Sequence, residues 1–469
     1  MRFTTEGLKK AGMNLHAPFQ IDVQLDPDKD VGDSSIQTLE FQQVTRVLPG
    51  RRVSGIALCE GRTVFAKIFY GRQARRYWGR ELNGAALMAS SEAPSPPVIG
   101  QGATVDQGGY IALYQALPGA VGLSAADHGE ILAAVHCLAR LHDANLVQSD
   151  PHLDNFIRSE GVVYAVDSDS LRRAQLVRHH LTNLAAMLAQ RAPEFDDEIG
   201  EIWASYAHER GEYVARMGST EQVQRLTRRE RHLRVRRYLK KTQRECTEFV
   251  QRQKFTRDFL CDRQHWPRLQ RFMVFPEEFM TSGVPLKLGN SATVVRCVID
   301  GDAYVIKRYN IKDLAHRVKR WIKRRARNAW MNGHRLDFLG IDTAKPVALL
   351  EQRWGWFAGV SYLVMPDCGE RDLVHTLANA PERLEVLAPK VVALLKKLRQ
   401  AGLAHGDLKA TNFMVNGDDV LLIDYDAVRE GDSERDVARF LENWADNPEL
   451  LATWQHYLES ESSETEAPT

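Results

Sequence analysis

The segment HGDLKATN, residues 405–412, decides the interpretation of this chain, and the apolar run VLLID that follows it ends at Asp424. Asp407 and Asn412 are five residues apart, and Asp424 lies twelve residues beyond Asn412. The loop is entered from a helical apolar pattern and left through a strand pattern, so we expect its three oxygen-bearing side chains to lie near one another. Such a set can orient a hydroxyl group and hold a divalent cation.

The same skeleton occurs in the first half of the chain. Asp150, Asn155 and Asp167 are separated by the same intervals of five and twelve residues. A lysine also stands on a strand-like run upstream of each loop, Lys67 in FAKIFY and Lys307 in YVIKRY. One such loop alone is a common pattern, but the duplicated spacing with an upstream lysine predicts two modules of one design in tandem.

These residue types fit phosphoryl transfer from ATP. That reaction needs a cation on the phosphates, Mg²⁺, and a carboxylate that orients the attacking hydroxyl. We therefore expect ATP and Mg²⁺ as cofactors. The predicted roles are catalytic for Asp407 and Asp150, metal binding for Asn412, Asp424, Asn155 and Asp167, and phosphate binding for Lys307 and Lys67.

Two further residues belong to the predicted nucleotide site. Glu81 lies fourteen residues beyond Lys67 on a predicted helix, where a carboxylate can hold the lysine in register. The corresponding helix of the second half reads WMNG at residues 330–333 and offers no obvious equivalent. The glycine-rich loops LPGRRVSG and KLGNSATV are degenerate, and Gly289 in the second is a candidate contact for the nucleotide.

The second half resembles a known family. HGDLKATNFMV followed by LLIDYDAVR, LGI followed by AKPVALL, and YLKKTQRECTEF are similar to the bacterial lipopolysaccharide kinases that phosphorylate Kdo or heptose, within the protein-kinase-like superfamily. The resemblance covers about residues 225–445, and the first half, about 36–200, is similar but more divergent. It implies an α+β fold of two tandem kinase-like modules, each with a β-rich lobe and a mainly helical lobe. It also implies a lipopolysaccharide core sugar as acceptor.

Departures from the protein-kinase pattern keep alternatives open. Tyr425-Asp426 and Ser168-Asp169 stand where protein kinases have Phe-Gly, and no A-P-E segment follows Asp424. This favours a small or glycolipid acceptor over a protein. Because Gln148 replaces His405, one module can be inactive, and we expect His405 itself to support the loop. A protein kinase, a small-molecule kinase and a nucleotide-binding pseudokinase scaffold for an anionic partner are the alternatives.

Composition and the order of polar, apolar and charged segments predict the class of protein and the domain limits. The chain has 469 residues, 44% of them hydrophobic and 26% charged, with a formal net charge of +1, so we expect a globular protein that does not bind nucleic acid. The six cysteines lie far apart and indicate no zinc or disulfide site. We predict a polar segment at 1–35, module 1 at 36–220, module 2 at 221–458 with a basic lead-in helix at 221–250, and an acidic disordered tail at 459–469.

No secretory signal and no membrane-spanning run of about 18–20 apolar residues is apparent, so we expect a cytoplasmic protein. Basic residues follow each lysine strand and form either a solvated helix face or a contact with anionic lipid or an anionic sugar. The oligomeric state is left open. The basic residues are Arg72, Arg75, Arg76 and Arg80 in the first half, and Arg317, Lys319, Arg320, Lys323, Arg324, Arg325 and Arg327 in the second.

Overall fold

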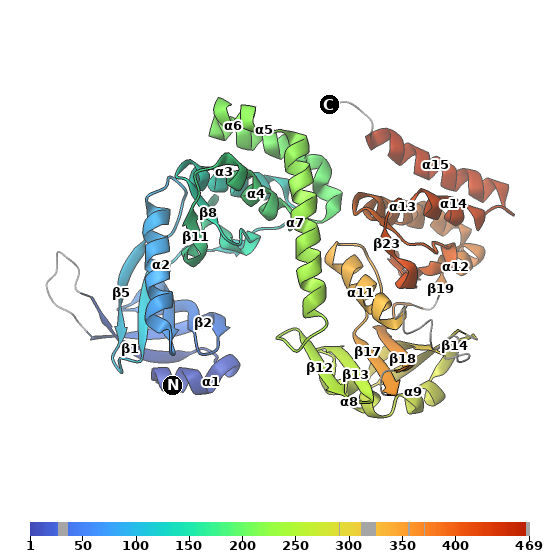
Figure 1. Cartoon of the computed structure of the whole chain (residues 1–469), viewed down its shortest axis with the longest axis horizontal. Helices are drawn as coiled ribbons and strands as arrows, with labels where there is room; N and C mark the ends of the chain where they lie inside the picture. The colour runs from blue at the N-terminus through green and yellow to red at the C-terminus, as the bar shows by residue number, and fades with distance from the viewer. Residues whose placement is uncertain (27–35, 290, 311–324, 355–356, 370, 466–469) are drawn as a thin grey trace. The chain divides into compact units, whose positions relative to one another are not determined.

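The computed structural model describes residues 1–26, 36–289, 291–310, 325–354, 357–369 and 371–465 (Figure 1). The chain divides into two compact units. Unit 1 comprises Met1–Arg191 and Asp197–Arg231, and unit 2 comprises Ala192–Asp196 and His232–Thr469. The limit between the units, at 231/232, falls inside helix α7 (Thr220–Lys241). The predicted limit, at 220/221, lies at the start of this helix.

Unit 1 begins with a closed six-stranded barrel in the order β1-β2-β3-β4-β6-β5. Alternate residues of its strands point into a core that contains Leu39, Val53, Ala66 and Ile111. Helix α2 runs alongside the barrel (Figure 1), where the Trp78 indole donates to the Ile111 carbonyl at 2.8 Å. The strands are β1 (Phe19–Leu25), β2 (Ile36–Leu48), β3 (Arg52–Cys59), β4 (Arg62–Tyr70), β5 (Val98–Thr104) and β6 (Gly109–Gln115), and α2 is Ala74–Ala89.

The rest of unit 1 is mainly helical and positions the first loop. Helix α3 (His128–Asp143) starts at Asp127, whose side chain caps the Glu130 amide, and it leads into the loop through β8 (Leu146–Gln148). The hairpin β9 (Phe156–Ser159) and β10 (Val162–Ala165) then delivers Asp167. The remaining elements are α1 (Thr5–Ala11), β7 (Val121–Gly122), β11 (Leu171–Arg173), α4 (Val177–Leu188), α5 (Ile199–Arg210) and α6 (Glu212–Met217).

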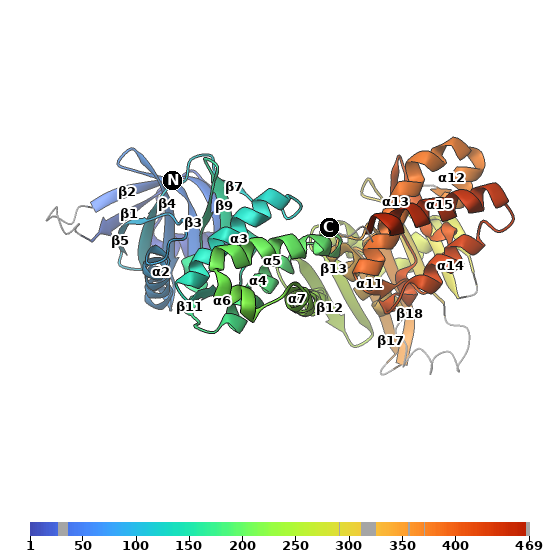
Figure 2. The same cartoon turned by 90° about the horizontal axis from the view of Figure 1, so that it is seen from above.

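Unit 2 contains a seven-stranded antiparallel sheet, β12-β13-β17-β18-β16-β15-β14. Helices α12 to α15 gather together in its helical part (Figures 1 and 2). The sheet strands are β12 (Phe249–Lys254), β13 (Arg257–Asp262), β14 (Val284–Leu288), β15 (Ala292–Ile299), β16 (Asp302–Tyr309), β17 (Ala348–Trp354) and β18 (Phe357–Pro366). The helices are α8 (Trp266–Val274), α9 (Pro276–Ser282), α11 (Arg325–Phe338), α12 (Leu373–Asn379), α13 (Leu384–Gln400), α14 (Glu434–Glu442) and α15 (Pro448–Thr465).

The second of the two predicted loops, residues 405–412, belongs to unit 2 and lies between short strands. Strand β20 (Leu403–Ala404) enters the loop and pairs with β23 (Arg429–Glu430) after it. Between them, β21 (Phe413–Asn416) and β22 (Asp419–Leu422) form the hairpin that delivers Asp424, and β19 (Arg371–Asp372) pairs with β21. The hairpin packs in a core with Leu408, Ala410 and Tyr425.

Three predicted segment limits differ from the structure. The polar segment 1–35 contains α1 and β1, because Phe19, Ile21 and Val23 alternate inward and close the barrel. The lead-in helix 221–250 ends at Lys241, and buried Phe249 and Val250 begin β12 instead. Helix α15 extends to Thr465, into the segment 459–469 that was predicted to be disordered.

Candidate active site

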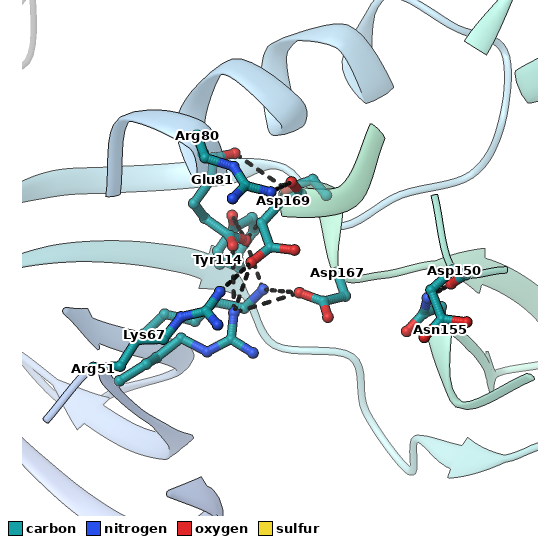
Figure 3. A network of polar contacts seen from close by, with 11 residues as sticks. Arg51, Lys67, Arg80, Glu81, Tyr114, Asp150, Asn155, Asp167 and Asp169 are labelled. Atoms are coloured by element: carbon teal, nitrogen blue, oxygen red, sulfur yellow. Dashed lines mark hydrogen bonds and ion pairs between the residues drawn. The ribbon is translucent and has the colours of Figure 1, made fainter. Parts of the chain in front are cut away.

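The predicted lysine of unit 1 lies in a buried ion-pair network (Figure 3). Its Nζ atom, on β4, is 2.6 Å from Glu81 Oε1 on α2 and 3.4 Å from Asp167 Oδ1. Tyr114 on β6 donates its hydroxyl to the same Glu81 oxygen at 2.6 Å. Lys67, Glu81 and Asp167 are therefore brought together as the sequence predicted.

Arg52 is a member of this network that the sequence prediction missed. Its Nη1 atom lies 3.4 Å from Asp167 Oδ1, 3.6 Å from Glu81 Oε2 and 3.9 Å from Asp169 Oδ2. Arg51 adds an ion pair to Asp169 at 3.2 Å. The arginine pair in LPGRRVSG was visible, but its contacts depend on the position of β3 beside β4 in the folded barrel.

Asp167 has a left-handed backbone conformation, with φ of 64°, at the end of the β9–β10 hairpin. Burial alone would raise the pKa of this carboxyl, but Lys67 and Arg52 more than offset burial and hold the pKa below its ordinary value. At Asp169, burial and the neighbouring carboxylates Asp167 and Glu81 raise the pKa instead. The network thus keeps Asp167 ionised.

The loop of unit 1 is held by backbone contacts. Asn155 donates its Nδ2 to the Asp150 carbonyl at 3.0 Å, so the two predicted residues are adjacent. Asn183 on α4 donates to the Gln148 carbonyl at 2.6 Å and accepts from the Gln148 amide at 3.3 Å. In Figure 3, Asp167 is on the side of the ion-pair network that faces Asp150 and Asn155.

In unit 2, the predicted lysine is held by two aspartates. Lys307 Nζ on β16 is 2.6 Å from Asp424 Oδ1 and 3.1 Å from Asp426 Oδ2. Tyr309 donates its hydroxyl to Asp426 at 2.8 Å, and Arg325 pairs with Asp426 at 3.0 Å. Asp426 is therefore part of the lysine network.

Asp424 repeats the geometry of Asp167. It is left-handed, with φ of 60°, and follows the β21–β22 hairpin. Burial would raise its pKa, but the ion pair and hydrogen bond with Lys307 offset burial and lower the pKa below its ordinary value. Both candidate metal aspartates are therefore anionic at neutral pH.

Strand register shows why unit 2 has no counterpart of Arg52. On β3, Arg52 pairs with Phe69, two residues after Lys67. On β15, Ala292 pairs with Tyr309, two residues after Lys307. An alanine methyl therefore stands where unit 1 carries a guanidinium.

Two glycines identify the counterpart of Glu81. A Cβ atom on Gly84 would lie 1.9 Å from the carbonyl oxygen of Ser168. One on Gly333 would lie 2.4 Å from Pro346 and 2.9 Å from the ring of Tyr425. Ser168 and Tyr425 each follow the metal aspartate, so the glycines mark equivalent close approaches of α2 and α11. Three residues before Gly333 stands Trp330, which is fully buried and donates to Thr242 at 3.1 Å. The helix carboxylate predicted to be missing from unit 2 is replaced by this core residue.

The backbone of the unit 2 loop is held by the carboxylate of Asp436 on α14. Its carboxylate accepts from the His405 amide at 2.6 Å and from the Gly406 amide at 2.9 Å. The His405 ring nitrogen Nε2 contacts the Ile423 carbonyl at 3.1 Å, in the supporting position that we expected. Asn412 donates its Nδ2 to the Asp407 carbonyl at 2.7 Å.

Asp407 also has two cationic neighbours that the prediction did not include. Arg439 on α14 lies 2.8 Å from Asp407 Oδ1, and Lys409 lies 3.4 Å from the same oxygen. The predicted nucleotide contact Gly289 lies in the turn between β14 and β15, where its carbonyl accepts from Asn310 at 3.0 Å. Of the predicted basic residues, Arg317, Lys319, Arg320, Lys323 and Arg324 lie outside the described residues.

The residues present fit a divalent cation in unit 2. The side-chain nitrogen of Asn412 donates to the Asp407 carbonyl, so its side-chain oxygen remains for a metal. This oxygen and the Asp424 carboxylate are hard ligands suited to Mg²⁺. In unit 1, Glu81, Asp167 and Asp169 have ligand atoms within 4.8 Å of one another. There, however, the three carboxylates are already balanced by the three cations Lys67, Arg52 and Arg51.

Comparisons with known proteins agree with this chemistry. Residues 370–467 match a family model described as the phosphotransferase enzyme family. Mitogen-activated protein kinase 12 of Danio rerio is 31% identical over 104 residues, covering 21% of this chain and 28% of that protein. Mitogen-activated protein kinase 13 of Homo sapiens is 31% identical over 99 residues, covering 20% and 27%. The chain thus spans less than a third of the length of these relatives.

One solved structure, described as WaaP in complex with acyl carrier protein, is 17% identical and covers 44% of this chain and 99% of its own, with a TM-score of 0.29. A similarity at this level defines neither the fold nor the activity of this chain. The prediction of an α+β, kinase-like phosphotransferase is confirmed for the segment that the family model matches. Among the described residues, no helix has the length and apolar character needed to cross a membrane.

Proposed function

We propose that unit 2 transfers the γ-phosphoryl group of ATP to a hydroxyl of a sugar, heptose or Kdo, in the lipopolysaccharide inner core. The observation that carries the proposal is the convergence of Lys307, Asp424 and the Asp407 loop in one unit. The family match at residues 370–467 includes this loop and supports phosphotransfer.

Each residue has a defined part in the proposed reaction. Lys307 moves from Asp424 to the ATP phosphates, and Asp424 with Asn412 would hold Mg²⁺, which neutralises charge on those phosphates. Asp407 accepts a hydrogen bond from the acceptor hydroxyl. The hydroxyl oxygen forms a bond to the γ-phosphorus as the bond to the β-phosphate oxygen breaks, ADP leaves, and the hydroxyl proton passes to Asp407 and then to water.

A small or glycolipid acceptor is favoured by the segment after Asp424. Residues 425–433 form one short turn and β23, and α14 follows directly. Its Asp436 accepts from the His405 amide in the loop. No segment of the kind that binds a peptide is inserted between Asp424 and α14. This leaves the loop open to a compact acceptor and makes protein the second candidate substrate.

For unit 1, we propose a related nucleotide site in which Lys67, Glu81, Asp150, Asn155 and Asp167 have the corresponding roles. Asp167 is paired with two cations, Lys67 and Arg52, whereas Asp424 is paired with Lys307 alone, and we therefore assign the main turnover to unit 2. A cytoplasmic location with peripheral contact to an anionic inner-membrane surface completes the proposal. The exposed Arg72, Arg75 and Arg76 are the described residues that would make this contact.

The test is phosphate transfer by the purified full chain to core oligosaccharide, followed by mass spectrometry. Asp407→Asn should lower transfer by about 10²- to 10⁴-fold, the range expected for loss of an acid–base group. Asp446→Asn, at an exposed site on the same unit, is the matched control and should retain wild-type transfer. Phosphate on protein instead of oligosaccharide would favour the protein-kinase alternative. Turnover unaffected by both Asp407→Asn and Asp150→Asn would favour a scaffold.

A further inference from the structure

The cations beside Asp407 point to a second feature of the acceptor site. Arg439 and Lys409 both bind the same oxygen of the predicted base, at 2.8 and 3.4 Å. Both side chains remain 44% exposed, while the Asp407 side chain is 35% exposed. Neither cationic side chain is therefore fully enclosed by the protein.

The position of Arg439 is fixed by the helix that supports the loop. Asp436 on α14 holds the His405 and Gly406 amides, and Arg439 follows one turn later on the same helix. Arg429 adds a third positive charge, because a Cβ atom on Gly406 would lie 2.9 Å from its guanidinium. Three cationic side chains thus lie next to the loop of unit 2.

Unit 1 shows that these cations are not needed to build such a loop. Asn183 there contacts Gln148 as Asp436 contacts His405, so Ala186 stands in the place of Arg439. His152 stands in the place of Lys409 and pairs with Asp154 at 3.1 Å. Among the described residues, Asp150 has no ion pair. The two cations are an addition specific to unit 2.

We propose that Arg439 and Lys409 form an anion-binding subsite for a phosphate or carboxylate group carried by the acceptor next to its reacting hydroxyl. Binding of that group draws the two cations from Asp407, which then accepts the hydrogen bond of the hydroxyl. A neutral acceptor leaves Asp407 in its ion pairs. This inference rests on the proposed function of unit 2 and deepens it by naming the charge of the substrate.

The experiment compares anionic and neutral forms of one acceptor on the full chain. Core oligosaccharide is used untreated, after phosphatase treatment, and after methyl esterification of its carboxylates, so that the two anion sources are separated. Binding is measured by calorimetry and transfer by mass spectrometry. Arg439→Gln is compared with Arg435→Gln, an exposed arginine on the same helix, one residue before Asp436.

For the wild type and for Arg435→Gln, we expect affinity and kcat/KM to fall at least about tenfold when the critical anion is removed or esterified. Arg439→Gln should lose this difference, with the decrease confined to the anionic acceptor. Equal affinity of the wild type for all three forms, or an equal decrease in Arg439→Gln for anionic and neutral forms, would overturn the subsite. Arg439-dependent binding without phosphate transfer would instead overturn the proposed function and leave the subsite standing.

Discussion

The two units hold an equivalent lysine in different ways. In unit 1, Lys67 is shared between the helix carboxylate Glu81 and Asp167, with Arg52 as a second buried cation. In unit 2, Lys307 has no helix partner and is held by Asp424 and Asp426. The comparison teaches that matched spacing in sequence fixes where the groups meet, while the residues around them decide the charge balance of the site.

The helix next to the lysine strand is also anchored differently. In unit 1, the pair Lys67–Glu81 itself ties α2 to the sheet. In unit 2, Arg327 of α11 binds Asp258 on β13 and Glu351 on β17, the latter at 2.6 Å. Unit 2 therefore separates the attachment of its helix from the handling of the lysine.

The largest expected difference between the units is in catalysis. Asp424→Asn should lower phosphate transfer at least about hundredfold, because it removes a charge that is needed on the metal and on Lys307. Asp167→Asn should leave transfer near wild type, since Arg52 already neutralises Asp167. Initial rates with purified full chain measure both, and an equal loss in the two variants would show that the units act alike.

Glu81→Gln should destabilise unit 1 by about 3–5 kcal/mol, because it breaks a buried ion pair and leaves three cations, Lys67, Arg52 and Arg51, with two carboxylates. Hydrogen exchange of β4 and β6 amides in the full chain reports the change. Glu92→Gln, at an exposed site just beyond α2, is the control. Unchanged protection in Glu81→Gln would mean that the network does not anchor α2.

Arg327→Gln tests the separate anchor in unit 2. Loss of charged hydrogen bonds to Asp258 and Glu351 should destabilise unit 2 by about 1.5–3 kcal/mol, with Arg353 still paired to Asp258. Exchange of β13 and β17 amides should rise while that of β4 stays constant. A rise confined to unit 1 would contradict the assignment.

The smallest effect concerns pH. Burial lowers the pKa of His405 below its ordinary value of 6.5, so the unfolded chain binds more protons than the folded chain between the folded pKa and 6.5. Stability from neutral His405 is thus complete above pH 6.5 and falls as pH decreases, by at most about 1.4 kcal/mol per pH unit. His405→Gln, the residue type of unit 1, should remove this slope.

The full chain is unfolded in urea at about pH 5, 6 and 7, and hydrogen exchange in peptides from unit 2 reports the unfolding free energy at each pH, which gives the slope. His334 is buried in the same unit with a pKa lowered to about 3, and it remains in both proteins as an internal reference. An identical slope in wild type and variant would show that His405 does not titrate with unfolding.

The sequence predicted which candidate site residues lie close together better than it predicted the residues around them. Lys67, Lys307 and the loop residues could be found because each lies at a fixed distance from a strand or loop that local pattern defines. Arg52 could not, because its contacts depend on which residues of β3 and β4 face each other. Asp436 and Arg439 were missed for a similar reason: they reach the loop from a later helix.

The first and last segments show the same limit for the fold. The alternation in FQIDVQL was present at residues 19–25, but only closure of the barrel makes it a buried strand. Basic composition suggested one helix through residue 250, whereas pairing with β13 decides that 249–254 is a strand. Non-local pairing overrides local propensity in both places.

The left-handed backbone of Asp167 and Asp424 has a consequence for engineering. A side chain in this conformation costs about 1–2 kcal/mol compared with glycine, so glycine at either position would relieve strain. The same change would remove the ion-pair partner of Lys67 and Arg52, or of Lys307, at a cost of about 3–5 kcal/mol, which exceeds this relief. Ion pairing therefore outweighs backbone strain at these two positions, and a selection for heat resistance should retain both carboxylates.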